Sequence, residues 1–176
     1  TECLWLIHRL EHEANGSGGA VHYLLGNHEL MVLRGDLRYV HERYMQGIAR
    51  RSFAYDDLFG PETELGRWLR TKPTLLRLGR MLFVHAGITP ERLSEMKSIS
   101  HINDLVREGL DYSTARLHFD QSISKLYGGL GPLWYRGYVY GIEERYPAAA
   151  SVEIDSVLLL CDVDHIVVGH SEQDRL

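Results

Sequence analysis

The first part of the chain has hydrophobic patterns that predict a helix, a loop and then a strand. Over residues 2–14, apolar residues recur at helical spacing between charged residues, which predicts an amphipathic helix. The glycine-rich residues 15–19, NGSGG, end this helix in a loop. Residues Val21 to Leu25 are mostly apolar and predict a short strand that is buried on both faces.

Helical patterns then lead into a hairpin. Residues 36–50 predict a helix, and another helix starts within Pro61 to Leu69. The segment PTLLRLGRMLFVHAG predicts two strands, Thr74 to Leu78 and Met81 to Val84, joined by a tight turn at Gly79 and Arg80.

The second half of the chain is mostly helical before it returns to a strand. From Pro90 to Tyr127 the pattern is amphipathic, with interruptions near residues 99–103 and near Asp111. Ser151 to Cys161 predicts a further helix, and His165 to Ser171 predicts a strand. Strands that alternate with helices indicate an α/β protein.

Composition narrows the class of protein. The length of 176 residues suits a single domain, and 44% hydrophobic with 24% charged residues is typical of a globular chain. A net charge of −5 argues against a nucleic-acid partner, and no apolar stretch approaches the roughly 20 residues that span a bilayer. The cysteines, Cys3 and Cys161, are too few for a disulfide framework, so a reducing, cytoplasmic location is expected.

Three predicted strands end next to a histidine. In HYLLGNHE the predicted strand is followed by Gly26, Asn27 and His28. In MLFVHAG the residue after the strand is His85, and IVVGH ends in His170. Because ligands bind at the carboxyl ends of strands in an open α/β sheet, we expect these side chains to converge. Imidazoles with an oxygen donor suit Zn, Fe or Mn.

These residues resemble the motifs of the calcineurin-like metallophosphoesterase superfamily, and in particular of the phosphoprotein phosphatase family. The motifs are GNHE at residues 26–29, VHAG at residues 84–87 and GHS at residues 169–171, and GPLWYRG resembles the family's Pro-Leu-Trp segment. The similarity extends over nearly the whole chain. It implies a central β-sandwich flanked by helices, incomplete at both ends, within one domain over residues 1–176. Residues 90–130 would form a helical cap.

The resemblance also implies roles for individual residues. Asn27, His85 and His170 would bind one metal of a two-metal centre, and His28 would be the general acid. Arg136 is the candidate phosphate-binding residue, because a guanidinium matches phosphate oxygens in bidentate geometry. The implied substrate is a phosphoserine or phosphothreonine protein, and a small phosphoester is the alternative.

Two motifs of the family are absent from the sequence. Gly-Asp-x-His-Gly and Gly-Asp-x-x-Asp-Arg-Gly, which would bring the remaining metal ligands, do not occur. We therefore interpret the chain as an interior piece of a longer phosphatase that is nearly inactive alone and holds at most one metal weakly. Open edges of its sheet would favour self-association.

Two other functions remain open. HRLEH carries His8, Glu11 and His12 in the His-x-x-Glu-His pattern of inverted zinc peptidases, with both histidines on one helical face. A catalytically inactive module that binds phosphate or protein is the other alternative.

Overall fold

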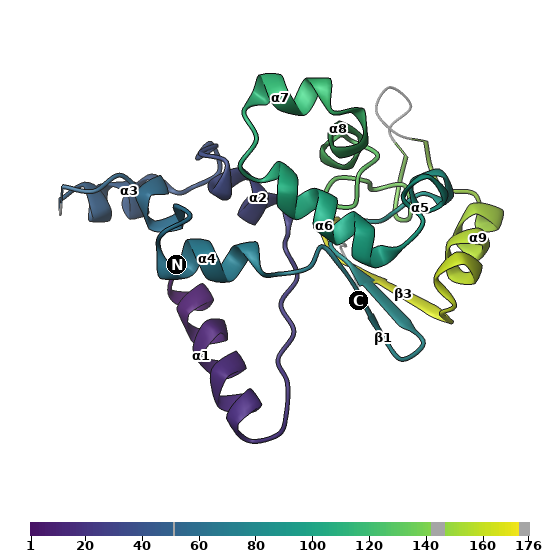
Figure 1. The fold of residues 1–176 in the computed structure, drawn as a ribbon, viewed down its shortest axis with the longest axis horizontal. Helices are drawn as coiled ribbons and strands as arrows, with labels where there is room; N and C mark the ends of the chain where they lie inside the picture. The colour runs from purple at the N-terminus through teal and green to yellow at the C-terminus, as the bar shows by residue number, and fades with distance from the viewer. Residues whose placement is uncertain (51, 142–146, 173–176) are drawn as a thin grey trace. The chain divides into compact units, whose positions relative to one another are not determined.

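The computed structural model describes residues 1–50, 52–141 and 147–172 and divides the chain into two compact units. The helical unit contains Thr1–Tyr23 and His28–Lys72, and the sheet unit contains Leu24–Asn27 and Pro73–Leu176. Figure 1 shows the chain from its N-terminus in purple to its C-terminus in yellow. The single domain and the helical cap stay predictions.

The predicted first helix is confirmed. The first part of the chain forms α1 (Glu2–Gly16), α2 (Asn27–Leu33), α3 (Glu42–Ala49), the 3-10 helix η1 (Asp56–Phe59) and α4 (Glu64–Arg70).

The helix predicted over residues 36–50 is shorter in the structure. Gly35 has a φ of 75°, which turns the chain after α2, and α3 begins only at Glu42. The imidazole of His41 caps α3 by accepting a hydrogen bond from the Arg43 backbone N–H at 3.2 Å. At α4 the hydroxyl of Thr63 accepts from the Gly66 N–H in the same way.

The predicted hairpin is confirmed, and a third strand extends its sheet. Strand β1 (Leu75–Leu78) is antiparallel to β2 (Met81–Val84), which is parallel to β3 (His165–Val168). The order is β1-β2-β3, and this is the one sheet that the described residues form.

Four helices contribute to the core on one face of this sheet, and a fifth packs on them. The four are α5 (Pro90–Met96), α6 (Ile99–Gly109), α8 (Gln121–Tyr127) and α9 (Ser151–Cys161), whereas α7 (Thr114–Phe119) packs against α8.

The main core of the sheet unit lies between these helices and one side of β1 and β2. Leu75 and Leu82 are fully buried there, together with Ile102 and Val106 of α6. Figure 1 shows α6 above the strands, and α5 packs against α9. On the opposite side of the sheet, residues such as Met81 remain exposed. Alternation of side chains along each strand explains the two unlike faces.

One predicted helix interruption is misplaced. The expected break at residues 99–103 lies instead at Lys97, whose φ is 66°, and Ser98 then caps α6 through the His101 N–H. The interruption near Asp111 is confirmed, because α6 ends at Gly109 and α7 begins at Thr114.

The strand predicted for Val21 to Leu25 is not formed. Residues 19–26 form neither helix nor strand, and the Leu25 N–H donates to the Pro73 carbonyl at 2.9 Å. A strand requires a neighbouring strand in register, which apolar composition alone cannot supply. Leu25 of this segment is nevertheless buried among the core residues.

Among the described residues no helix combines the length and the apolar composition needed to cross a membrane.

Candidate metal centre

Three side chains of the sheet unit meet at one point, as the sequence predicts. The Nε2 atom of His85 lies 2.8 Å from Oδ1 of Asn27 and 3.1 Å from Nδ1 of His170. The rings of the two histidines are 4.9 Å apart between centroids. Asn27 is 5% exposed, and both histidines are half-buried. The cluster is therefore shielded from solvent on most of its sides.

Strand register brings the two histidines together. Val84 of β2 is paired with Val168 of β3 in a parallel ladder, so the residues that follow the two strands emerge side by side. The contact continues beyond the ladder, because the Gly169 N–H donates to the His85 carbonyl at 2.9 Å. His85 and His170 are thus placed by the rigid end of a sheet.

Asn27 reaches the cluster from a separate segment. It is the first residue of α2, and the preceding chain is anchored to the sheet unit by the Leu25–Pro73 hydrogen bond. The GNHE motif therefore follows a segment that is neither helix nor strand, and its asparagine is held at the start of a helix.

The sharp turn beside His170 is made by the histidine itself. His170 has a φ of 61°, in the left-handed region that costs an L-residue roughly 1–2 kcal/mol, whereas Gly169 lies outside that region. A Cβ on Gly169 would meet the His85 carbonyl oxygen at 3.6 Å, an ordinary contact. Glycine is therefore not required at position 169 for the chain to turn. The strain at His170 is consistent with a functional position.

The glycine-rich loop of residues 128–137 covers one side of the cluster. The Ala86 N–H donates to the Pro132 carbonyl at 3.0 Å, which ties this loop to the segment after β2. The ring of Trp134 then lies edge-on to His170 with centroids 6.0 Å apart. Gly87 lets the loop pack closely, because a Cβ there would make a tight contact of 3.0 Å with the Tyr135 ring.

Arg136 belongs to the same loop, but its side chain is directed to another partner. Its guanidinium donates to the Tyr140 hydroxyl at 2.6 Å and lies 5.9 Å from the centroid of that ring. The role of Arg136 in binding phosphate stays a prediction, and it requires the guanidinium to leave Tyr140.

His28 follows Asn27 directly on α2 and is grouped with the helical unit. Its imidazole is exposed, and its ring centroid lies 5.2 Å from that of Tyr39. The next residue, Glu29, is hydrogen-bonded to Tyr23. Burial and this carboxylate both raise the pKa of the Tyr23 hydroxyl well above its usual range. The role of His28 as general acid stays a prediction.

The two measured separations are compatible with ligands of one divalent metal. Two neighbouring ligands of an octahedral ion, with bonds of about 2.1 Å at right angles, lie about 3.0 Å apart. The observed separations of 2.8 and 3.1 Å agree with that value. No third histidine, cysteine, aspartate or glutamate joins them among the described residues, which contain no group of three such side chains able to hold a metal. The ligand set at this point is therefore neutral.

The HRLEH motif has a structural explanation in α1. The Glu11 carboxylate accepts hydrogen bonds from Trp68 Nε1 at 2.5 Å and from Lys72 Nζ at 2.6 Å. His8 packs edge-on against Trp68 and lies 3.3 Å from a Glu64 carboxylate oxygen. The glutamate of the peptidase pattern is thus an ion-pair partner inside the helical unit, and His12 is exposed.

Comparison with known proteins shows which proteins the chain resembles. No protein-family model matches the chain. An uncharacterized fission yeast protein, C1840.07c, is 30% identical over 168 residues, which is 93% of this chain and 48% of the yeast protein. Shewanella-like protein phosphatase 1 of Plasmodium berghei is 24% identical over 95% of the chain and 46% of its own length.

A crystal structure has the same fold. The cold-active protein-tyrosine phosphatase of a psychrophilic Shewanella species superposes with a TM-score of 0.89 and 41% identity, over 99% of this chain and 51% of that protein. The chain therefore spans about half the length of these relatives.

This chain belongs to the calcineurin-like metallophosphoesterase superfamily. The predicted fold class, α/β of the metallophosphoesterase type, is confirmed.

Proposed function

We propose that these residues form part of a metal-dependent phosphoester hydrolase that acts on phosphorylated proteins. The observation that carries the proposal is the convergence of Asn27, His85 and His170, with both histidines at the ends of adjacent parallel strands. The named relatives support the class, because the Plasmodium protein is a protein phosphatase and the Shewanella protein is a protein-tyrosine phosphatase.

In this proposal each residue has one task. Oδ1 of Asn27, Nε2 of His85 and Nδ1 of His170 would hold a divalent ion. Divalent ions supply positive charge to phosphoryl oxygens and make water more acidic when they are bound. His28 would donate a proton from its imidazolium to the leaving oxygen, a step that typically contributes about 10²–10⁴-fold.

The relatives favour phosphotyrosine over the phosphoserine and phosphothreonine implied by the sequence motifs. The phosphatase at 41% identity is named for tyrosine, and it resembles this chain more closely than the Plasmodium protein does. We therefore propose phosphotyrosine as the preferred residue. Rates on peptides that differ only in the phosphorylated residue would decide between the two.

The decisive experiment removes one metal ligand at a time. In the whole hydrolase of which these residues would form part, loaded with Mn²⁺, His85→Ala or His170→Ala should reduce metal binding and lower kcat for p-nitrophenyl phosphate by at least about 100-fold. His165→Ala is the matched control, because His165 begins β3 but is exposed and outside the cluster. Metal binding and turnover that survive both ligand substitutions would refute the proposal.

The same experiment separates the enzyme from an inactive binding module. A module would bind phosphate or a phosphopeptide in a way that depends on His85, without releasing inorganic phosphate. Phosphate release that requires His85 would exclude that alternative.

Metal affinity should be low for the described residues alone. Three neutral ligands place no negative charge beside a dication, and no carboxylate completes the set among the described residues. Calorimetric titration of the 176-residue chain with Mn²⁺ should give at most one weak site. A tight two-metal isotherm would contradict this expectation.

A further inference from the structure

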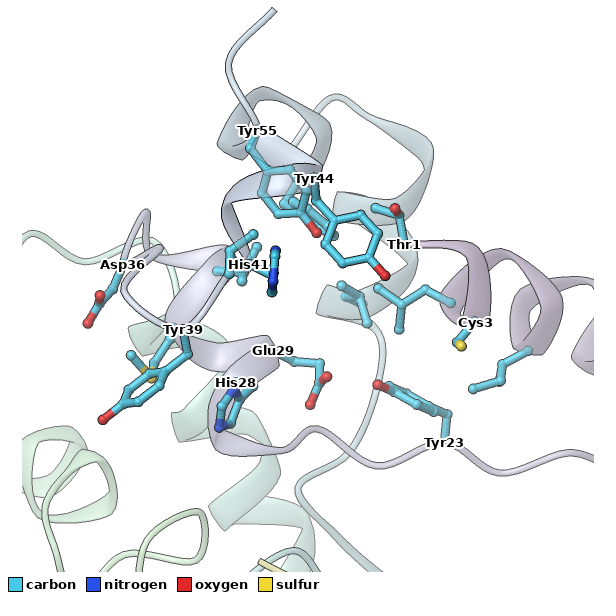
Figure 2. A pocket seen from close by; sticks show the side chains of 17 residues that line it. Thr1, Cys3, Tyr23, His28, Glu29, Asp36, Tyr39, His41, Tyr44 and Tyr55 are labelled. Atoms are coloured by element: carbon cyan, nitrogen blue, oxygen red, sulfur yellow. The ribbon is translucent and has the colours of Figure 1, made fainter. Parts of the chain in front are cut away.

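The hydroxyl of Tyr23 is hydrogen-bonded to the carboxylate of Glu29, further along the chain. Figure 2 shows the two groups facing each other on the wall of a pocket of about 390 Å³, which His28 also lines. Tyr23 and Glu29 both belong to the helical unit, and both are half-buried. The hydrogen bond therefore joins the two ends of the short segment between them, residues 24–28.

This short segment carries both groups that the proposed reaction takes from the GNHE motif. Asn27 supplies one of the three converging atoms, and His28 is the candidate general acid. Residues 24–26 form neither helix nor strand, so no regular structure holds the segment before α2 begins. Its position therefore depends on individual contacts, one of which is the hydrogen bond from the Leu25 N–H to the Pro73 carbonyl at 2.9 Å.

Tyr23 is itself anchored within the helical unit. Its ring stacks on that of Trp68 in α4, with centroids 5.3 Å apart and an angle of 29° between the planes. Trp68 is held in turn, because its Nε1 donates to the Glu11 carboxylate at 2.5 Å and the Lys72 ammonium lies 4.8 Å from its ring centroid. A hydroxyl on a ring that is packed in this way is a fixed donor, and it fixes the carboxylate that accepts from it.

The surroundings of the hydroxyl favour this hydrogen bond. Burial, first, and the Glu29 carboxylate, second, raise the pKa of the Tyr23 hydroxyl well above its usual range. The hydroxyl therefore stays protonated and remains a donor at neutral pH. A hydrogen bond to a carboxylate is roughly twice as strong as one between neutral groups.

We propose that Tyr23 is a positioning residue that holds the first turn of α2 in place through its hydrogen bond to Glu29. The amide of Asn27 and the imidazole of His28 both extend from this turn. The proposal rests on the proposed function for the roles of these two side chains. Contacts that orient a metal ligand from behind typically change metal affinity or activity by about 10–100-fold.

The kinetic test removes the hydroxyl and keeps the ring on Trp68. In the whole hydrolase of which these residues would form part, loaded with Mn²⁺, Tyr23→Phe should lower kcat for p-nitrophenyl phosphate by about 10–100-fold and change KM by less than about twofold. Tyr44→Phe is the matched control, because it removes another hydroxyl of the helical unit, one that accepts from the exposed Arg43. Equal values of kcat in the two variants would overturn the proposal.

Substitutions of the acceptor separate the hydrogen bond from the charge. Glu29→Gln keeps a carbonyl oxygen that accepts from Tyr23 and should retain at least about half of kcat, whereas Glu29→Leu should lose as much as Tyr23→Phe. The double variant Tyr23→Phe/Glu29→Leu should be no slower than either single variant, because the same bond is absent from all three. Additive losses, or a loss in Glu29→Gln as large as in Glu29→Leu, would overturn the proposal.

Two further measurements give a result even if the protein hydrolyses no phosphoester. In Tyr23→Phe, backbone hydrogen exchange at residues 24–30 should be about tenfold faster than in the wild type, and the affinity for Mn²⁺ should fall about tenfold. Neither quantity should change in Tyr44→Phe. Unchanged exchange and affinity in Tyr23→Phe would overturn the role of Tyr23. The expected changes, with no phosphate release by the wild type, would overturn only the proposed function.

Discussion

The sheet unit and the helical unit are stabilised by different kinds of contact. In the sheet unit, Leu75 and Leu82 are fully buried in a continuous apolar core. In the helical unit, α1 has no buried residue, and its central contact is the polar cluster of Glu11, Trp68 and Lys72. The metal ligands therefore belong to the unit with the continuous apolar cluster, whereas the helical unit buries fewer apolar side chains, among them Leu65 and Leu69 of α4.

The largest difference in stability should be between the core of the sheet unit and helix α1, and it is tested by removing a leucine from each. Leu82→Ala in β2 should lower the free energy of unfolding by about 2–5 kcal/mol, because a cavity remains in a tightly packed core. Leu10→Ala in α1, where Leu10 is 40% exposed, should cost less than about 1 kcal/mol. Urea unfolding measures both, and equal losses would abolish the distinction.

The free energy of unfolding should depend on Glu11, which belongs to the polar cluster of the helical unit. Glu11→Gln should cost about 1–3 kcal/mol, since Lys72, at 8% side-chain exposure, loses its charged partner. Glu13→Gln is the matched control, because Glu13 pairs with Arg9 on the exposed side of α1. Loss of stability in the control as large as in Glu11→Gln would show that the buried pair is unimportant.

The Glu11–Lys72 ion pair predicts that stability depends on pH. Burial raises the pKa of Glu11, but hydrogen bonds from Lys72 and Trp68 and the charge of Lys72 outweigh it, so the pKa lies below its ordinary value of 4.5. The stabilisation is therefore present above that value and is lost as the pH falls through the lower, folded-state pKa. Thermal melts between neutral and acid pH should show this loss in the wild type and not in Glu11→Gln.

A smaller loss of stability is expected from a substitution at the edge of the sheet. The Asn103 side chain accepts hydrogen bonds from the Thr74 and Leu75 N–H groups at 2.8 and 3.0 Å and donates to the Leu75 carbonyl at 2.9 Å. Asn103→Ala should cost about 1–2 kcal/mol, because backbone groups at β1 lose these partners. Metal binding should not change, and a parallel loss of metal would show that Asn103 also supports the site.

The smallest change in stability is expected from a substitution at Gly169. Gly169→Ala should change stability by less than about 0.5 kcal/mol, since its Cβ would make only an ordinary contact. Gly66→Ala is the contrast in the helical unit, because a Cβ there would lie 1.9 Å from the Gly60 carbonyl oxygen. A severe loss at Gly169 would mean that its flexibility, rather than the strand register, places His170.

Sequence patterns predicted the parts of this fold that depend on local periodicity and register. The hairpin, α1 and α9 follow from hydrophobic spacing, and His85 and His170 were predictable because each follows a recognisable strand.

Contacts between residues far apart in the sequence leave no periodic pattern from which they could be predicted. The apolar run of residues 21–25 lacks a strand partner, and the roles of Glu11 and Asn103 depend on Lys72 and Leu75, far away in the sequence. The pocket beside His28 combines residues from five helices and the segments between them, so no single motif indicates it.

The amide of Asn103 has a consequence for the protein in a crowded cell. By occupying the first backbone positions along the outer side of β1, it leaves an incoming polypeptide fewer places at which to add as a further strand. A single side chain can in this way discourage the intermolecular β-pairing from which aggregates and amyloid fibres grow.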